Sequence, residues 1–452
     1  EAFTYVSGKM MKFNIRVDKA EGNGKYRLTL VSESIAPWEN DLQSHDATAM
    51  EYVIINSTAG HLKDSIVASH KDIAMVKRMK VTGTINVYDF IIMRDSMPKL
   101  TALNLKDVRI KRVYNYTVGG VEYWTDYAED DVLPFNSFTG KRTLTSFVFP
   151  DVLNRIDVGA FAGAGLKGSL NIPEGVVEIG PGAFIDNDFT GILTLPSTLK
   201  KIGSGAFREC CFICPLNLPD GIEEIGSVCF ENCRYLYGNL TLPSHLKKLG
   251  SAAFAKCSGL KGDLVIPKSL TVIPSDAFNA CGLGGRLQLH DGITTIGNGA
   301  FGHNGFKGEL DLPKSLTELG GNNFWGNYFS GSLKIPKGLT NISEEAFSNC
   351  TFEGEVEIPE GITYIHKRAF IASENLQKVI LPSSLEFIDE YAFWYCKSLR
   401  VIECKSTVPP VVNSTAFDKV PLEDLTVIVP KSALNDYKSS DFWSGLLLKT
   451  VE

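Results

Sequence analysis

This chain of 452 residues lacks the features that mark several large classes of protein. It has no apolar run long enough to span a bilayer, no coiled-coil heptad repeat and no low-complexity segment. Its net charge of -7 and the absence of a basic cluster argue against nucleic acid as a partner. It also lacks a glycine-rich phosphate loop, a GxSxG elbow and an HExxH motif, so the sequence predicts neither an enzyme nor a cofactor.

Histidine is scarce, and its seven residues are scattered. His290 and His303 fall within one repeat, but His290 stands where other repeats have a turn proline, so we expect no metal site. Cys211 and Cys214 have the CxxC spacing, yet they lie in a repeat corner and not before the helix of a βαβ unit. We therefore expect no redox role.

What the chain does have is a phenylalanine that returns every 23 or 24 residues. A fixed period of this length is typical of a solenoid, in which each repeat is one coil that buries its apolar side against its neighbours. The repeat phenylalanines are Phe138, Phe161, Phe184, Phe207, Phe230, Phe254, Phe278, Phe301, Phe324, Phe347, Phe370, Phe393 and Phe417.

Other positions repeat with the phenylalanine. Aliphatic residues stand eight and five places before it, as Val176 and Ile179 do before Phe184, and the residue just before it is usually alanine. An apolar-x-apolar stretch follows, and a proline such as Pro196 ends it. This alternation predicts one short strand in each coil, because the side chains of a strand point to opposite faces in turn.

A column of cysteine and asparagine stands three residues after the phenylalanine. Leucine-rich repeats place such small polar groups inside the coil, where they bond the backbone of a tight turn. We therefore expect buried free thiols, although a local bridge that involves Cys211 or Cys214, which lie outside the column, stays open. The column consists of Asn187, Cys210, Cys233, Cys257, Cys281, Asn304, Asn327, Cys350 and Cys396.

The pattern Leu-x-x-Ile-Gly-x-x-Ala-Phe-x-x-Cys, followed by Leu-x-Leu-Pro, resembles the BspA-like leucine-rich repeat family over residues 137–430. Residues 79–90 and 100–105 resemble the irregular N-terminal repeats of that family, and the end of the chain resembles its closing segment. The resemblance implies a bacterial cell-surface or secreted protein, often lipid-anchored, that takes part in adhesion and binds host proteins. Because the chain starts at Glu1 without methionine, we expect a removed signal peptide, and a lipid anchor would lie upstream.

The fold expected is a β-rich solenoid, a right-handed leucine-rich repeat coil of about a dozen repeats. Alternating apolar residues predict a small β module over residues 1–58, and an irregular cap follows over residues 59–136. The solenoid covers residues 137–430 and a closing segment covers residues 431–452. Within the cap, the aromatic-rich stretch Arg112–Asp131 is too long for a turn, so its rings either cover the cap or form a binding surface.

The outward residues of the predicted strands form rows across the coils, one of which runs from Asn171 to Ile380. From residue 263 onward these rows become charged, which suggests a partner-binding surface, since solenoids commonly bind partners on such a face. The alternative is a face that is charged only for solubility. We call the candidate residues the charged strip: Asp263, Arg286, Glu309, Asp311, Lys334, Glu355 and Glu357.

A second candidate surface comes from the residue directly after the phenylalanine. Trp325, Ile371 and Trp394 hold this position, which we expect to face outward on the side away from the strands. Exposed tryptophans indicate contact with a partner, although packing against neighbouring coils explains them equally well.

The leading functional hypothesis is thus a non-enzymatic binding or adhesion protein that presents its strand face to a host or extracellular protein. The alternative is a glycan-binding component of a surface uptake system, in which rings such as Trp325, Tyr328 or Trp394 stack on sugars. An enzyme would need a polar pocket between the N-terminal module and the cap, for which the sequence offers no candidate group.

Overall fold

The computed structural model describes residues 52–118, 121–124 and 130–450, with the backbone alone for residues 115–124, and the backbone of four strands before residue 51. The chain divides into two compact units, Glu1–Tyr52 and Val53–Glu452. In the first unit the strands form two antiparallel pairs: β1 (Ala2–Val6) with β2 (Lys9–Phe13), and β3 (Ile15–Lys19) with β4 (Tyr26–Leu30).

The next strand, β5 (Val53–Ser57), belongs to the second unit, because it pairs in parallel with β6 (Arg78–Ile85). The division between the two units falls after Tyr52, six residues before the boundary that we expected after residue 58. β5, which falls within the range predicted for the N-terminal module, begins the sheet of the cap instead.

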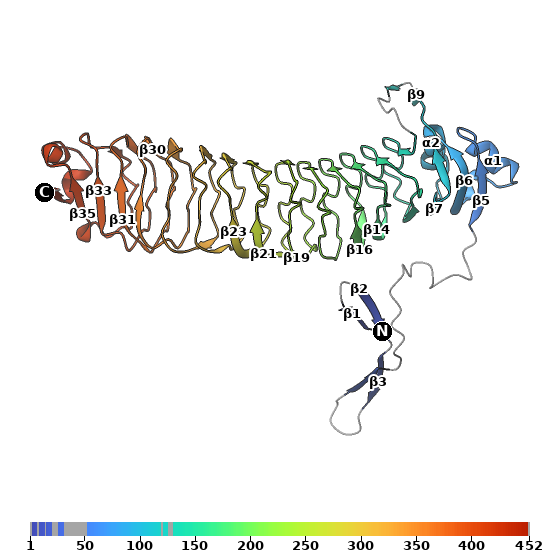
Figure 1. Cartoon of the computed structure of the whole chain (residues 1–452), viewed down its shortest axis with the longest axis horizontal. Coiled ribbons are helices and arrows are strands. Elements are labelled where there is room, and N and C mark those ends of the chain that lie inside the picture. Colours follow the sequence, from blue (N-terminus) through green and yellow to red (C-terminus); the bar gives the residue numbers. More distant parts are fainter. Residues whose placement is uncertain are drawn as a thin grey trace. The chain divides into compact units, whose positions relative to one another are not determined.

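The cap joins short helices to a parallel sheet (Figure 1). The strand order of this sheet is β12-β7-β6-β5, in which β12 is Ser146–Val148. The buried carboxylate of Asp89 accepts hydrogen bonds from the backbone N–H groups of Gly60 (2.7 Å), Leu62 (2.9 Å) and Asn86 (2.8 Å). Since N–H groups at helix starts have no partner within the helix, one side chain fixes the start of both helices. The elements are α1 (Leu62–Ala68), η2 (Ile73–Met75), α2 (Val87–Ile91), the π-helical turn η3 (Ile92–Ser96), β7 (Ala102–Asn104) and β8 (Val108–Ile110).

The aromatic-rich stretch leaves the coil as an antiparallel hairpin of β9 (Asn115–Val118) and β10 (Val121–Trp124). At its base the guanidinium carbon of Arg112 lies 3.6 Å from the centre of the Tyr114 ring. The remaining aromatic side chains of the hairpin lie outside the described residues, so their role in covering the cap or in binding stays a prediction.

The second unit is an elongated solenoid of about 17 turns (Figure 1). This number exceeds the dozen predicted repeats, because the coils of the cap lack the repeat phenylalanine. Each regular coil has a strand on one side, a two-residue strand on a second side, and a tight corner that holds the phenylalanine. Every strand pair of the repeats is parallel, as stacked coils require.

We call the side with the longer strands the strand face. Its strands are β12 (Ser146–Val148), β14 (Lys167–Asn171), β16 (Asp188–Thr194), β19 (Gly238–Asn239), β21 (Leu260–Val265), β23 (Gly284–Gln288), β25 (Lys307–Gly308), β27 (Tyr328–Phe329), β29 (Gly354–Glu357), β31 (Leu376–Leu381), β33 (Val401–Cys404), β35 (Thr426–Val429) and β36 (Leu447–Thr450).

The second side carries the two-residue strands, whose second residue is the aliphatic that recurs in the sequence. They are β11 (Val132–Leu133), β13 (Arg155–Ile156), β15 (Glu178–Ile179), β17 (Lys201–Ile202), β18 (Glu224–Ile225), β20 (Lys248–Leu249), β22 (Val272–Ile273), β24 (Thr295–Ile296), β26 (Glu318–Leu319), β28 (Asn341–Ile342), β30 (Tyr364–Ile365), β32 (Phe387–Ile388) and β34 (Val411–Val412). The recurring aliphatic is buried in every strand except β20 and β34, where Leu249 and Val412 are half-buried.

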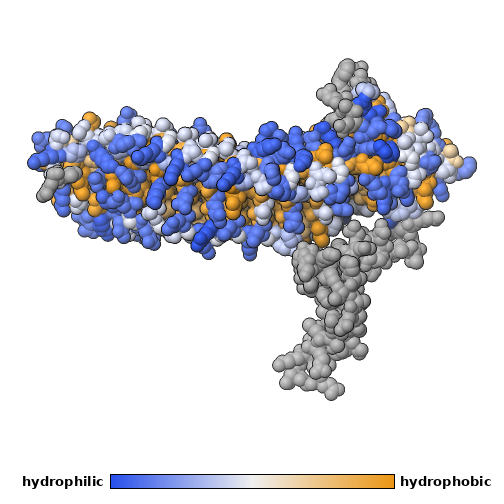
Figure 2. Space-filling model, in the orientation of Figure 1, coloured by the Kyte–Doolittle hydropathy of each residue, from blue (hydrophilic) through white to orange (hydrophobic). Residues whose placement is uncertain are grey.

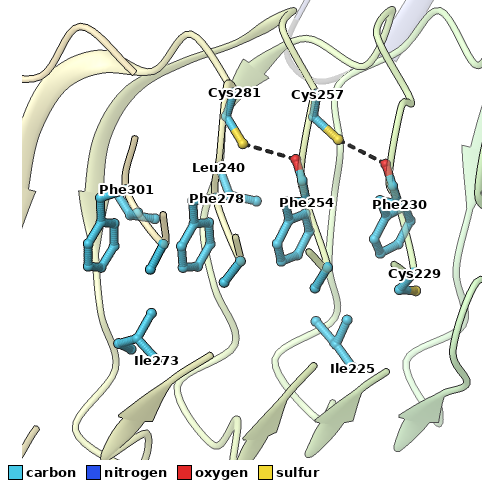
Figure 3. Packing of buried hydrophobic residues seen from close by; sticks show 14 of the residues in the cluster. Ile225, Cys229, Phe230, Leu240, Phe254, Cys257, Ile273, Phe278, Cys281 and Phe301 are labelled. Atoms are coloured by element: carbon cyan, nitrogen blue, oxygen red, sulfur yellow. Dashed lines mark hydrogen bonds between the residues drawn. The ribbon is translucent and has the colours of Figure 1, made fainter. Parts of the chain in front are cut away.

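The repeat phenylalanines stack in one column through the core, as Figure 3 shows for Phe230, Phe254, Phe278 and Phe301. The rings of Phe254 and Phe278 are 5.7 Å apart and 4° from parallel. The backbone N–H of Phe254 donates to the carbonyl of Ala277 in the next coil at 2.9 Å. Alanine stands here because the backbones of two corners approach each other beside the ring, which leaves room only for a small side chain.

The cysteine and asparagine column bonds the corner backbone, as the sequence predicts. In Figure 3 the Sγ of Cys281 donates to the carbonyl of Phe254 at 2.9 Å, and that of Cys257 donates to the carbonyl of Phe230 at 3.0 Å. Asn304 makes the corresponding bond to the carbonyl of Phe278 at 2.8 Å. All ten cysteines are free thiols, including Cys211 and Cys214.

The end of the solenoid is closed by a compact segment of short helices and β36. The ring of Phe442 stacks on Phe417 at 5.2 Å and so covers the last repeat phenylalanine. The buried Trp443 donates from Nε1 to the carbonyl of Pro410 at 2.9 Å, and Tyr437 donates to the carbonyl of Ser406 at 3.1 Å. The helical elements are η4 (Leu422–Asp424), η5 (Lys431–Ala433), α3 (Leu434–Lys438) and η6 (Trp443–Gly445).

Candidate functional site

All seven residues of the charged strip are exposed on the strand face. Asp263 lies in β21, Arg286 in β23, and Glu355 and Glu357 in β29. Glu309 directly follows β25, Asp311 lies two residues further on, and Lys334 forms a backbone bridge with Glu357. The stacking of the repeats therefore places these charges on successive coils.

The C-terminal end of the strip is neutralised by lysines from the following coils. The Nζ of Lys378 lies 3.0 Å from Glu355 and 2.9 Å from Glu403, and the Nζ of Lys405 lies 2.6 Å from Glu357. The bond to Glu403 raises the pKa of Lys378, and the bond to Glu357 raises the pKa of Lys405. This part of the strip is an ion-pair network and not an acidic surface.

The middle of the strip holds charges without such partners. Within the described part of the chain, the side chains of Glu309, Asp311 and Lys334 form no ion pair and no hydrogen bond. Asp263 accepts a hydrogen bond from the backbone N–H of Arg286 at 2.7 Å. Within the described part of the chain, a partner can therefore engage Glu309, Asp311 and Lys334 without first breaking a bond of their side chains.

One residue of the outward row does not face solvent. Ile380 in β31 is only 8% exposed, although the alternation predicts that it points outward. It lies in register between Glu357 and Glu403 on the neighbouring strands. The outward row is therefore interrupted at β31.

The second candidate surface, at Trp325, Ile371 and Trp394, contains a groove. Trp325, Ile371 and Trp394 are half-buried and line one groove of about 490 Å³ at the phenylalanine corners of four successive coils. We call this the aromatic groove, and its lining residues are Trp325, Glu345, Ser348, Asn349, Arg368, Ile371, Tyr391 and Trp394.

The two tryptophans of the groove are held in place by aromatic neighbours. The ring centres of Trp325 and His303 are 3.9 Å apart, and Trp394 stacks on Tyr395 at 4.9 Å. Tyr395 in turn lies 3.9 Å below the Nζ of Lys397. Such contacts restrict the rotamers of both tryptophans and make the groove rigid.

Sequence reasoning missed the other five lining residues, and three of them share one repeat position: Glu345, Arg368 and Tyr391. Each stands two residues before the repeat phenylalanine of its coil. These three residues could have been predicted from the repeat period, because residues at one position of successive coils stack beside each other. The guanidinium of Arg368 lies 3.1 Å from the carboxylate of Glu345, so these two charges neutralise each other.

The second side of the solenoid carries a ladder of alternating charges that the sequence analysis also missed. Arg155, Glu178, Lys201, Glu224 and Lys248 lie in register on adjacent two-residue strands. Their charged atoms are 2.8–3.9 Å apart along the row. The bond to Lys248 lowers the pKa of Glu224. This paired row contributes to stacking of the coils.

The thiols of the cysteine and asparagine column are unsuited to act as nucleophiles. Burial raises the pKa of Cys396 to about 12, and it raises the pKa values of the thiols of Cys257 and Cys281 as well. Among the residues that the structure describes, no group of three His, Cys, Asp or Glu side chains could hold a metal ion. No helix in the described ranges has both the length and the apolar character needed to cross a bilayer.

A family model described as the BspA type leucine-rich repeat region matches residues 132–261, 235–331, 262–352 and 327–442. A solved leucine-rich repeat protein from Bacteroides ovatus is 25% identical, with a TM-score of 0.53, over 78% of this chain and 92% of that one. A leucine-rich cell surface protein from Faecalibacterium prausnitzii is 16% identical, with a TM-score of 0.32, over 89% and 95% of the two chains. No curated protein matches the chain.

The fold, the corner hydrogen bonds and the family match all indicate the same class of protein. This chain is a leucine-rich repeat solenoid, and it belongs to the BspA type leucine-rich repeat family.

Proposed function

We propose that this protein is a non-enzymatic, extracytoplasmic binding protein that recognises another protein through the middle of its charged strip. The observation that carries the proposal is the group of exposed, unpaired charges at Glu309, Asp311 and Lys334 on the strand face, within the described part of the chain. The location outside the cytoplasm rests on what is typical of the family.

The rigidity of the strand face supports binding. Backbone ladders flank the middle of the charged strip, between β21 and β23 on one side and between β29 and β31 on the other, so little main-chain order has to form in these flanks when a partner docks. In the view of Figure 2, hydrophilic side chains cover most of the solenoid and apolar residues lie between them in narrow rows. Such a surface favours a polar partner, whose approach would be steered by charge.

The mixture of charges on the strip indicates which charges the partner's surface would carry. Asp263, Glu309 and Asp311 are acidic, while Arg286 and Lys334 interrupt them. The complementary surface would carry basic residues flanked by acidic ones. These groups are solvated carboxylates and amines without a nucleophile beside a base, which favours recognition over catalysis.

The test is capture of purified host extracellular proteins and mucus proteins by the whole chain, compared with the double variant Glu309→Lys and Asp311→Lys. The matched control is Glu344→Lys with Glu423→Lys, which makes the same charge change at exposed positions outside the strip. We expect salt-sensitive capture by the wild type and the control, and loss of capture by the strip variant with an unchanged melting temperature. Equal capture by all three proteins, or no capture by the wild type, would overturn the proposal.

A further inference from the structure

The aromatic groove is separate from the charged strip, and its geometry suits an elongated ligand. Trp325 and Trp394 stand at its two ends, with two coils between them. The coil spacing over this stretch, measured between successive phenylalanine rings, is 5.8, 5.4 and 5.3 Å. The ends of the groove are therefore three coil spacings apart, a length that fits a short chain of linked rings better than a single ring.

The residues between the two tryptophans explain why the surface is concave there. The corresponding positions of the two middle coils are Ser348, which is buried and small, and Ile371, which is half-buried. The amide of Asn349 donates from Nδ2 to the hydroxyl of Ser348 at 3.0 Å. The groove thus combines large aromatic surfaces with a few fixed polar groups, the usual composition of a small-molecule site.

The groove has no net charge. Its carboxylate, Glu345, and its guanidinium, Arg368, form an ion pair at 3.1 Å. The adjacent Lys367 and Glu390 also pair, at 2.7 Å. A cation would meet the repulsion of Arg368 despite the aromatic rings, and an anion would meet Glu345. A neutral ligand fits this site best.

The backbone around the groove is already bonded between coils. The N–H of Asn349 donates to the carbonyl of Ile371, and the N–H of Ala372 donates to the carbonyl of Trp394, both at 2.8 Å. An extended peptide, which gains much of its affinity from main-chain hydrogen bonds, would find these groups occupied. Recognition here must come from ring faces and from polar side chains.

We propose that the aromatic groove binds a neutral oligosaccharide. The apolar faces of its sugar rings would pack on Trp325 and Trp394, with Tyr391 contributing further aromatic surface. Its hydroxyl groups would exchange hydrogen bonds with Asn349 and with the outer atoms of the Glu345–Arg368 pair. This site is independent of the charged strip, so a protein partner and a glycan could be bound by different sides of one coil.

The test is titration of the whole chain with maltohexaose, cellohexaose and N-acetylchitohexaose. Binding is measured by the change in tryptophan fluorescence and by calorimetry. We expect saturable binding of at least one of them, weakened about tenfold or more by Trp394→Ala and by Trp325→Ala. Tyr235→Ala is the matched control, since Tyr235 is 57% exposed and does not line the groove. Ile371→Arg provides a variant that keeps every ring but fills the middle of the groove.

The outcomes separate this proposal from the strand-face proposal. Binding that is lost in Ile371→Arg and kept in the Glu309→Lys, Asp311→Lys protein supports the groove alone. If no neutral oligosaccharide binds, if only acidic glycans or a proline-rich peptide bind, or if the tryptophan variants bind normally, the inference is wrong. Melting temperatures of all variants show whether any loss comes from unfolding.

Discussion

Replacing Asn304 by alanine should weaken the solenoid strongly, because this side chain serves two coils. Its Nδ2 donates to the carbonyls of Phe278 (2.8 Å), Phe301 (3.0 Å) and Gly302 (3.1 Å). Its Oδ1 accepts a hydrogen bond from the N–H of Cys281 at 3.2 Å. The side chain is only 3% exposed, so water cannot replace these bonds.

The expected loss follows from the groups left without a partner. The carbonyl of Gly302 keeps the N–H of Ala280 (2.9 Å), and that of Phe301 keeps Nδ2 of Asn327 (3.0 Å). The carbonyl of Phe278 and the N–H of Cys281 lose the bonds that Asn304 gave them. Since each unsatisfied buried group costs about 1–3 kcal/mol, Asn304→Ala should lower the free energy of unfolding by about 2–6 kcal/mol.

Urea denaturation followed by circular dichroism measures this loss. Asn304→Cys is the matched variant, because other coils carry cysteine here with a bond to the same carbonyl. It should retain the bond to Phe278 and leave only the N–H of Cys281 without a partner, so its stability should lie between those of wild type and Asn304→Ala. A free energy of unfolding for Asn304→Ala within about 1 kcal/mol of wild type would refute the reasoning.

Three further predictions concern the core, the thiols and the charge ladder. Ala277→Leu should destabilise the protein by about 1–3 kcal/mol in the same denaturation assay, since the residue is fully buried against the corner of the neighbouring coil. In native protein an alkylating agent should label Cys211 far faster than the nine buried thiols, as mass spectrometry would show; rapid labelling of Cys257 would contradict the packing described. Glu224→Gln should cost less than about 1 kcal/mol at neutral pH and low salt. Because the folded pKa of Glu224 is lowered, its contribution should be present above its unfolded pKa of about 4.3 and lost on acidification, so variant and wild type should converge at acid pH in thermal melts.

The coil could be predicted from the sequence because its packing is periodic. The column positions of Phe278, Ala277 and Cys281 recur at a fixed spacing, and each recurrence reflects a contact that every coil must make. The outward direction of Asp311 and Lys334 was equally predictable from the apolar-x-apolar pattern, since the preceding residues Leu310 and Leu333 are buried.

The features that escaped prediction depend on contacts between coils and not on the period alone. The pairing of Lys378 with two glutamates follows from the register and rotamers of three coils, which a single repeat does not encode. The groove was foreseen only as two tryptophans and an isoleucine, because its hollow depends on the small Ser348 between them.

Carboxyl footprinting of a captured complex tests the central claim most directly. It compares the chemical modification of each exposed carboxylate in the free protein and in the complex. Our account predicts that Glu309 and Asp311 are protected in the complex while Glu344 and Glu423 react as before. Unchanged modification of Glu309 and Asp311, with protection elsewhere, would contradict the claim that the middle of the charged strip binds the partner.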